Sequence, residues 1–177
     1  MIFKETKLKG AFIIDLDKKK DNRGFFARTF CANEFKEKGL QTHFVQGNMS
    51  QTLKKHTLRG MHYQTDGAEE VKLIRCTVGK IVDVIIDLRE NSKTYGEYIA
   101  VELSQENSRQ IYVPKGFAHG FLTLTKNSEI SYLVSEFYSP GKEKGIRWND
   151  PYFKIDWPSK DPFLSQKDAD YKNFENR

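Results

Sequence analysis

The 177 residues predict a single all-β domain, a sandwich or barrel of many short strands. Apolar residues alternate mostly with period 2, the apolar runs are short, and turn-forming residues separate them at close intervals. A chain of this length is typical of one domain. With 13 Phe, 8 Tyr and 2 Trp it can bury a sizeable core without disulfides or a metal.

Strands are expected wherever the alternation is clear, with Gly, Pro, Asn, Asp or Ser between them. Residues 80–89 are the clearest case, because one face is formed by Val, Ile and Leu while the other mixes Ile with Asp. The other strands are expected at residues 11–16, 24–30, 72–77, 98–103, 110–113, 121–125 and 130–137.

One helix is expected, at residues 32–39, with Asn33 as a possible N-cap and Gly39 as its end. The chain shows no internal repeat, low-complexity tract or interdomain linker. We therefore expect one domain over residues 1–177, with a tail that is loose from about residue 169.

Cysteine use and hydropathy indicate a cytoplasmic protein. Cys31 and Cys76 are far apart and have no metal-binding spacing, so neither a disulfide framework nor a thiolate zinc site is expected. Charge at Lys4 and Glu5 interrupts any apolar leader, and no apolar run approaches the roughly 18 residues of a membrane span.

The net charge of +5 comes from 29 Lys and Arg scattered among 24 Asp and Glu. No basic helix or basic-aromatic strip is present, so a nucleic-acid partner is not expected. A small anionic ligand fits this distribution better.

A first chemical candidate is His119, which follows a turn marked by Pro114 and Gly116. After this turn His119 is expected to open a new strand. The Pro-x-Gly-x-x-His pattern resembles the second motif of the cupins, which are double-stranded β-helix barrels of the jelly-roll type that usually bind a metal. It predicts such a barrel with a few short helices. Taken alone, the motif favours a histidine that is hydrogen-bonded within a β core.

A second histidine, His62, lies where the first cupin motif would have His-x-His, but Gln64 occupies the second position. Glu69 or Glu70 could supply a ligand, yet two histidines, one carboxylate and an amide make a poor closed metal site. No metal is expected, and a 2-His-1-carboxylate iron site stays open as an alternative.

Lys72 and Tyr132 suggest proton transfer instead, because His, Lys and Tyr are a plausible base, oxyanion stabiliser and acid. Each residue also has an ordinary explanation. Lys72 could lie on a solvated strand face, Tyr132 could fill the core, and Arg59 could form a surface ion pair.

Seven segments carry a resemblance that extends from about residue 2 to residue 170. They are Asp21-x-Arg23-Gly24-Phe25-Phe26, Phe44-Val45-Gln46-x-Asn48-x-Ser50, Leu58-Arg59-Gly60-Met61-His62-Tyr63-Gln64, Glu70-x-Lys72-Leu73, Val113-Pro114-x-Gly116-Phe117-Ala118-His119-Gly120-Phe121, Gly145-x-x-Trp148-Asn149-Asp150-Pro151 and Leu164-Ser165-x-Lys167-Asp168. In this order and spacing the chain resembles the dTDP-4-dehydrorhamnose 3,5-epimerase family.

The resemblance implies an isomerase that inverts C3 and C5 of dTDP-4-dehydro-6-deoxy-D-glucose and so supplies deoxysugar for surface polysaccharide. Both carbons flank the C4 ketone, so an enolate can form and no cofactor is expected. By this match His62 is the base and Asp168 orients it. Tyr132 would return a proton on the opposite face, and Lys72 would stabilise the enolate charge.

The resemblance also implies a substrate pocket for a nucleoside-diphosphate 4-keto-6-deoxysugar. The matching positions for the sugar and the diphosphate are Arg23, Gln46, Asn48, Arg59, His119, Glu143 and Lys167. The candidates for stacking on the base are Phe25, Phe26 and Tyr138. The chain departs from some members at Arg28, where they have Glu.

Members of the family are homodimers in which an N-terminal strand of one subunit extends the other's sheet and lends residues to its pocket. Residues 11–16 offer such a strand, so a homodimer is expected, with no nucleic acid and no membrane as partner. Three alternatives stay open: an enzyme that inverts only C3 or C5 or uses another nucleotide sugar, a metal-dependent cupin oxygenase, and a non-catalytic carbohydrate-binding barrel.

Overall fold

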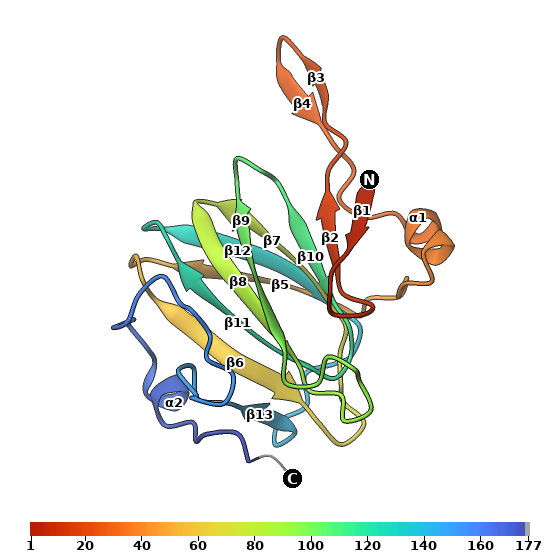
Figure 1. Ribbon diagram of the computed structural model, residues 1–177. Helices are drawn as coiled ribbons and strands as arrows, with labels where there is room; N and C mark the ends of the chain where they lie inside the picture. Colours follow the sequence, from red (N-terminus) through yellow and green to blue (C-terminus); the bar gives the residue numbers. More distant parts are fainter. Residues whose placement is uncertain (176–177) are drawn as a thin grey trace.

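The computed structural model describes residues 1–175, which form two antiparallel sheets that face each other (Figure 1). Spatial neighbours that are distant in sequence make this a jelly roll and confirm the predicted double-stranded β-helix. The six-stranded sheet contains, in spatial order, β1 (Ile2–Glu5), β2 (Phe12–Asp15), β10 (Gln110–Val113), β7 (Lys72–Val78), β12 (Ser128–Val134) and β5 (Gln46–Thr52). The five-stranded sheet contains β13 (Glu143–Gly145), β6 (Leu58–Gln64), β11 (Phe117–Thr123), β8 (Lys80–Asp87) and β9 (Tyr98–Ser104).

The space between the sheets is apolar in one part and polar in another. Ile74 of β7 meets Ile85 of β8 and Leu103 of β9 in a fully buried cluster. Burial of one such side chain stabilises the fold by about 1.5–3 kcal/mol. The part enclosed by β5, β7 and β12 on one side and by β6 and β11 on the other is lined mainly by polar residues, and this is where the candidate site lies.

The outer faces of both sheets are also covered. The segment that follows β13 packs Phe153 and Trp157 against Val84 and Ile86 of β8. Both faces of β8 are therefore buried. This explains why neither face of residues 80–89 is formed by polar residues alone. On the other sheet, helix α1 (Ala32–Glu37) buries Phe35.

Two glycines let β6 and β11 approach closely. A Cβ on Gly60 would lie 2.5 Å from the Cα of Gly120, and Gly60 has a φ of +136°, a value that favours glycine. His62 and His119 are partners in the register of these two strands. The close pairing therefore brings both predicted histidines to the same part of the barrel.

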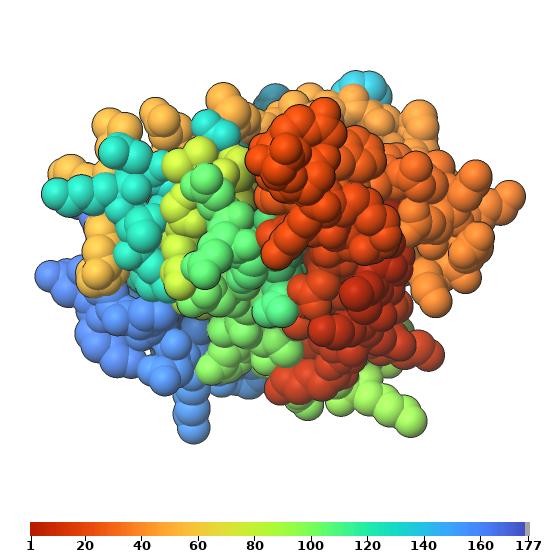
Figure 2. Space-filling view, turned by 90° about the horizontal axis from the view of Figure 1, so that it is seen from above, coloured from red at the N-terminus to blue at the C-terminus, as the bar shows by residue number. Residues whose placement is uncertain are grey.

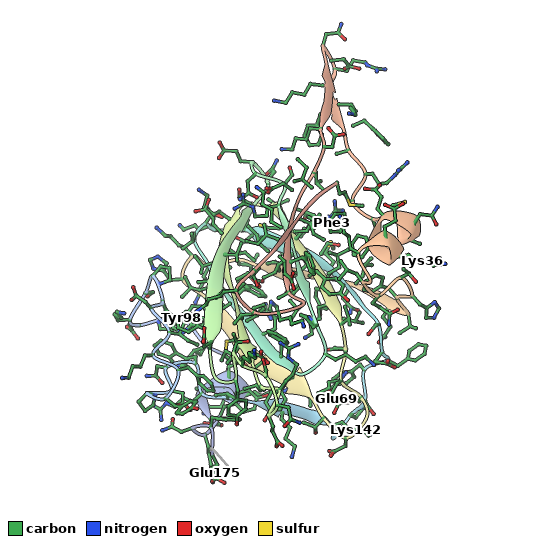
Figure 3. All side chains as sticks on the ribbon, turned by 45° about the vertical axis from the view of Figure 1, so that its right-hand side comes forward. Phe3, Lys36, Glu69, Tyr98, Lys142 and Glu175 are labelled. Carbon is green, nitrogen blue, oxygen red and sulfur yellow. The ribbon has the colours of Figure 1, made fainter. Side chains whose placement is uncertain are left out.

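A hairpin of β3 (Lys19–Asp21) and β4 (Gly24–Phe26), here called the arm, projects away from the two sheets (Figures 1 and 3). The strand expected at residues 24–30 ends at Phe26, because Phe30 packs against Phe35 of α1 instead. Seen from above, the N-terminal residues lie on one side of the molecule and the C-terminal residues on the opposite side (Figure 2).

Several boundaries differ from the sequence prediction. The N-cap of α1 is Cys31 and not Asn33, which lies inside the first turn, and no side chain caps the helix. Gly39, with a φ of +68°, follows the end of the helix as expected. Strand β11 begins at Phe117, which pairs with Asp87, so His119 lies within a strand and does not open it.

The C-terminal segment contains α2 (Gln166–Ala169), a short helix whose N-cap Ser165 accepts a hydrogen bond from the backbone of Asp168. After α2, the backbone of Lys172 accepts a hydrogen bond from Arg147, and Phe174 donates one to Asp150. The segment expected to be loose thus makes contacts with the body as far as residue 174, while residues 176 and 177 lie outside the described part. Within residues 1–175 no helix is long and apolar enough to cross a membrane.

Candidate active site

Two adjoining hollows of about 160 Å³ and 320 Å³ lie in the polar part of the barrel and share His62, Lys72 and Tyr132. The smaller is also lined by predicted residues Gln46, Asn48, Tyr138 and Glu143. The larger is also lined by predicted residues Arg59, His119, Lys167 and Asp168. Of the predicted site residues, only Arg23 and the stacking candidates Phe25 and Phe26 are in neither hollow.

His62 forms a hydrogen bond with Asp168, which α2 brings beside β6. The distance between His62 Nε2 and Asp168 Oδ1 is 2.6 Å. Burial raises the pKa of Asp168, but hydrogen bonds from His62 and from Ser165 outweigh it and lower that pKa from its ordinary value. The carboxylate is therefore charged at neutral pH and fixes Nε2 of His62 as the donor, which leaves Nδ1 as the nitrogen that can accept a proton.

His119 forms a second pair, with Asp83 of β8, at 2.8 Å between Nε2 and Oδ2. The Asp83 side chain is fully buried, and its Oδ1 has no hydrogen-bond partner among residues 1–175. Sequence reasoning missed this aspartate. The only signal was a carboxylate on a strand face that otherwise carries isoleucines, since Ile81 and Ile85 flank it and point into the core.

Lys72 and Tyr132 project inward from the neighbouring strands β7 and β12. Lys72 Nζ lies 3.0 Å from the carboxylate of Glu70, and both side chains are mostly buried. Burial raises the pKa of Tyr132, and nearby Glu70 raises it further, although Arg59 acts in the opposite direction. The Tyr132 phenol therefore holds its proton at neutral pH and can act as an acid.

The rim of the two hollows carries a connected set of polar side chains. Glu143 Oε2 lies 2.9 Å from Lys167 Nζ and accepts a hydrogen bond from the Tyr138 hydroxyl at 3.2 Å. Burial raises the pKa of Glu143, but Lys167 and His62 outweigh it and lower that pKa. Gln46 accepts a hydrogen bond from the backbone of Tyr138. These contacts tie the loop before β13 to the site.

Gln64, at the position where a cupin would have a second metal-binding histidine, is engaged elsewhere. Its amide donates to Ala68 and Glu70 and accepts from the backbone of Ser139. In the described part of the chain, residues 1–175, no three His, Cys, Asp or Glu side chains form a group that could hold a metal ion.

Arg23 lies at the tip of the arm, where it pairs with Asp21 at 2.6 Å and has a side chain that is 85% exposed. Phe25 and Phe26 lie on the same hairpin, so they do not join Tyr138 in this chain. Arg28 is outside both hollows and pairs with Glu34 at 3.3 Å. The site within one chain therefore lacks every predicted residue of the arm.

Tyr171 is a further neighbour of the site that no sequence motif indicates. Its ring packs edge-on against His62, with 5.8 Å between the ring centroids. Nothing in the local sequence predicts this contact, because Tyr171 reaches β6 only through the path of the chain after α2.

Comparison with known proteins identifies relatives along nearly the whole chain. A family model described as dTDP-4-dehydrorhamnose 3,5-epimerase matches residues 5–176. The dTDP-4-dehydrorhamnose 3,5-epimerase of Methanothermobacter thermautotrophicus is 44% identical over 173 residues, which cover 96% of this chain and 92% of the relative.

Solved structures agree with these matches. The structure of dTDP-4-dehydrorhamnose 3,5-epimerase from Elizabethkingia anophelis gives a TM-score of 0.95 at 40% identity, covering 98% of this chain and 96% of that chain. The 3,5-epimerase from Legionella pneumophila, solved in complex with dTDP-4-keto-L-rhamnose, gives a TM-score of 0.91 at 38% identity, covering 97% and 92%. Similarity of this extent shows that the chain belongs to the dTDP-4-dehydrorhamnose 3,5-epimerase family of isomerases.

Proposed function

We propose that the chain inverts C3 and C5 of dTDP-4-dehydro-6-deoxy-D-glucose and so produces dTDP-4-dehydro-L-rhamnose. Both carbons lie beside the C4 ketone, so loss of a proton from either one gives an enolate. Inversion then needs a base on one face of the sugar, an acid on the other and a positive charge near the C4 oxygen. The reaction involves no net oxidation, and the proposed chemistry uses neither a metal nor a redox cofactor.

The observation that carries the proposal is that His62 and Tyr132 belong to opposite sheets and line the same two hollows. His62 is on β6 of the five-stranded sheet, and Tyr132 is on β12 of the six-stranded sheet. A sugar ring held between the sheets would have the imidazole on one face and the phenol on the other. This is the arrangement that inversion requires and that simple binding does not.

In the first step, His62 acts as the base. Nδ1 takes the proton from C3 or C5, the electron pair of the C–H bond forms the C=C bond of the enolate, and the ketone π electrons move to the C4 oxygen. Asp168 stabilises the imidazolium that results, as carboxylates do in other histidine–aspartate pairs. Lys72 stabilises the negative charge on the C4 oxygen.

In the second step, Tyr132 donates its proton to the carbon from the opposite face. The electron pair returns from the oxygen, the ketone is restored, and the carbon has the inverted configuration. Exchange with solvent then removes the proton from His62 and restores the proton of Tyr132. The same cycle acts on the other carbon.

The diphosphate requires cationic groups beside the sugar site. Arg59 borders the larger hollow and is anchored through Nε to Thr52 at 3.0 Å and through Nη2 to the backbone of Gln51 at 3.3 Å. Within residues 1–175 Nη1 forms no hydrogen bond, so it can donate to a phosphate oxygen. We assign this role to Arg59, with Lys167 as a second cation at the rim.

We further propose a homodimer in which the arm of each subunit reaches the partner's pocket. Phe25 and Phe26 are 54% and 73% exposed on a hairpin that projects from its own body. Apolar side chains presented in this way are typical of interaction surfaces. The dimer would supply Arg23 to a site that lacks it within one chain.

Complementation tests the dimer. We expect His62→Ala and Arg23→Ala to be inactive alone, while co-expression of the two regains about a quarter of the wild-type activity. The reason is that half of randomly paired dimers are mixed, and one of their two sites then has both an intact His62 and an intact Arg23. If the arm served its own subunit, every site would carry one defect and activity would not return.

Product analysis tests the activity itself. With dTDP-4-dehydro-6-deoxy-D-glucose in D₂O after exhaustive chelation, we expect NMR to show the doubly inverted product with deuterium at C3 and C5. Label and inversion at one carbon alone would indicate a single-carbon epimerase. Activity that returns only with added metal would contradict the proposed chemistry, and absence of label would indicate a binding barrel.

The substitution Tyr132→Phe tests the donor. We expect His62 still to form the enolate, so recovered substrate gains deuterium with its original configuration at one carbon at least, while doubly inverted product falls sharply. Mass spectrometry measures the label and proton couplings give the configuration. Inversion at the full rate would show that Tyr132 only packs the barrel, and loss of both exchange and inversion in a folded variant would place it in enolate formation.

A further inference from the structure

Tyr171 contacts the candidate base from the side of the C-terminal segment. Its ring lies 5.8 Å from the His62 ring between centroids, and the two planes make an angle of 68°. Tyr171 lies three residues after Asp168, just beyond the end of α2, and Asp168 holds Nε2 of the same imidazole. One short segment therefore supplies both the hydrogen-bond partner of His62 and an aromatic wall beside it.

The backbone leaves room for this ring at Gly145. A Cβ on Gly145 would lie only 2.1–2.3 Å from three atoms of the Tyr171 ring, so the ring covers the place where a side chain would stand. Gly145 is the register partner of His62 on the neighbouring strand β13. The space for the Tyr171 ring therefore depends on a residue without a side chain directly beside His62.

Tyr171 also affects Lys167 at the rim of the site. The pKa of Lys167 is raised first by its hydrogen bond with Glu143 and also by the Tyr171 hydroxyl, although loss of hydration acts in the opposite direction. Lys167 Nζ also lies 2.9 Å from the Glu143 carboxylate. The contact that the geometry itself shows is the one between the Tyr171 ring and His62.

We propose that Tyr171 is a positioning residue, which holds the imidazole of His62 at the angle needed for proton abstraction. The hydrogen bond to Asp168 fixes one ring nitrogen, but it leaves the imidazole able to tilt about that bond. The edge of an aromatic ring restricts this tilt. This role rests on the proposed function, since it concerns the same base.

The first test compares Tyr171→Ala with Tyr171→Phe. Aromatic pairs of this geometry have an effect equivalent to about 2- to 12-fold in a rate or equilibrium constant. We expect Tyr171→Ala to slow deuterium wash-in at C3 and C5 by about that factor. Tyr171→Phe keeps the ring, so wash-in is expected to stay within about twofold of the wild type.

Gly145→Ala provides a matched variant that displaces the ring without removing it. We expect this substitution to slow wash-in as Tyr171→Ala does, because its Cβ would occupy the position of the ring. The double variant Gly145→Ala with Tyr171→Ala is expected to be no slower than Tyr171→Ala alone. Strictly additive losses would mean that the two residues act separately, and this would overturn the proposal.

An NMR readout separates this proposal from the proposed function. The ¹⁵N signals of the His62 imidazole are expected to shift in Tyr171→Ala and to return toward wild type in Tyr171→Phe, with melting temperature as the control for folding. If the wild-type protein shows no deuterium exchange, the proposed function is wrong. The ¹⁵N signals of His62 would still show whether Tyr171 contacts and orients the imidazole. Normal wash-in and unchanged His62 signals in Tyr171→Ala would overturn the positioning role alone.

Discussion

The histidines of the two histidine–aspartate pairs lie on adjacent strands, but the surroundings of their carboxylates differ. The His62 side chain is 29% exposed, and Asp168 comes from a helix that is separate from the sheets. The His119 side chain is 13% exposed, and Asp83 is fully buried within a central strand. The histidine of the first pair is thus more accessible to a ligand, whereas the second pair lies deeper inside the barrel.

The contrast extends to the other partners of each carboxylate. Asp168 also interacts with Ser165 and with the backbone of Gly60, and these contacts help to lower its pKa. Asp83 has an oxygen with no hydrogen-bond partner in the described part of the chain. A buried carboxylate with one oxygen that lacks a hydrogen bond lowers the stability of the fold unless its single partner stays in place. His119 therefore contributes to stability in a way that His62 does not.

The largest effect is expected for His62→Ala. General-base catalysis is typically worth about 10²–10⁴-fold, so kcat should fall by that order, while the same substitution at His119 should mainly weaken substrate binding. Rates of product formation and of deuterium wash-in check this, with dTDP affinity as a control for an intact pocket. Near-normal turnover in His62→Ala would move the base to the His119 pair.

The next effect concerns stability and reverses the order of the two histidines. His119→Leu should lower the free energy of unfolding by about 3–5 kcal/mol, because it leaves the buried carboxyl group of Asp83 without its hydrogen-bond partner. His62→Ala should cost less than about 1 kcal/mol, since Asp168 keeps its other contacts. Urea unfolding at neutral pH measures both. Adding Asp83→Asn to His119→Leu should restore part of the loss, and failure to do so would show that charge is not the cause.

A smaller effect is expected for the two aspartates in catalysis. Asp168→Asn should lower kcat by about 10²-fold, because an amide cannot stabilise the imidazolium by charge. Asp83→Asn should lower kcat by less than about tenfold, since His119 does not carry the abstracted proton. Steady-state kinetics on both variants decides the matter. Equal losses of kcat in the two variants would mean that both pairs contribute to the same catalytic step.

The smallest effect is a pH dependence of stability. The pKa of Asp168 is lowered in the folded protein from its ordinary value of 3.8, so its ionised form contributes stability that is present above that value. This contribution is lost as the pH falls through the lower pKa of the folded state. We expect the difference in unfolding free energy between wild type and Asp168→Asn to shrink in that acidic range. A difference that grows with acid would mean that the charged form is not favoured.

Local patterns were sufficient to predict the fold class and several strands. Residues 110–113 form β10 as predicted, and residues 72–77 and 98–103 differ from β7 and β9 by a single residue at one end. Strand β5 was missed because its inward positions are polar, as in Asn48 and Ser50, which line the site and give no apolar alternation. Because residues that line the site must be polar, a search for hydrophobic periodicity does not detect this strand.

The site was predictable where a motif carried it and not where only the fold did. His62, Lys72 and Tyr132 come from three separate segments whose spacing matched a known family, and they line the same hollows. Asp83 and Tyr171 depend on strand register and on the path of the chain after α2. Neither can be read from a local pattern, because the contact is made with a residue far away in the sequence.

The position of Asp168 late in the chain affects when the candidate site is assembled during synthesis. It follows His62 by 106 residues, and in that interval the ribosome makes β7 to β13. A nascent chain can therefore complete both sheets while His62 still lacks its partner Asp168. The His62–Asp168 pair would form only after the barrel has closed. A partly synthesised chain would therefore have the pocket but not the proposed catalytic pair.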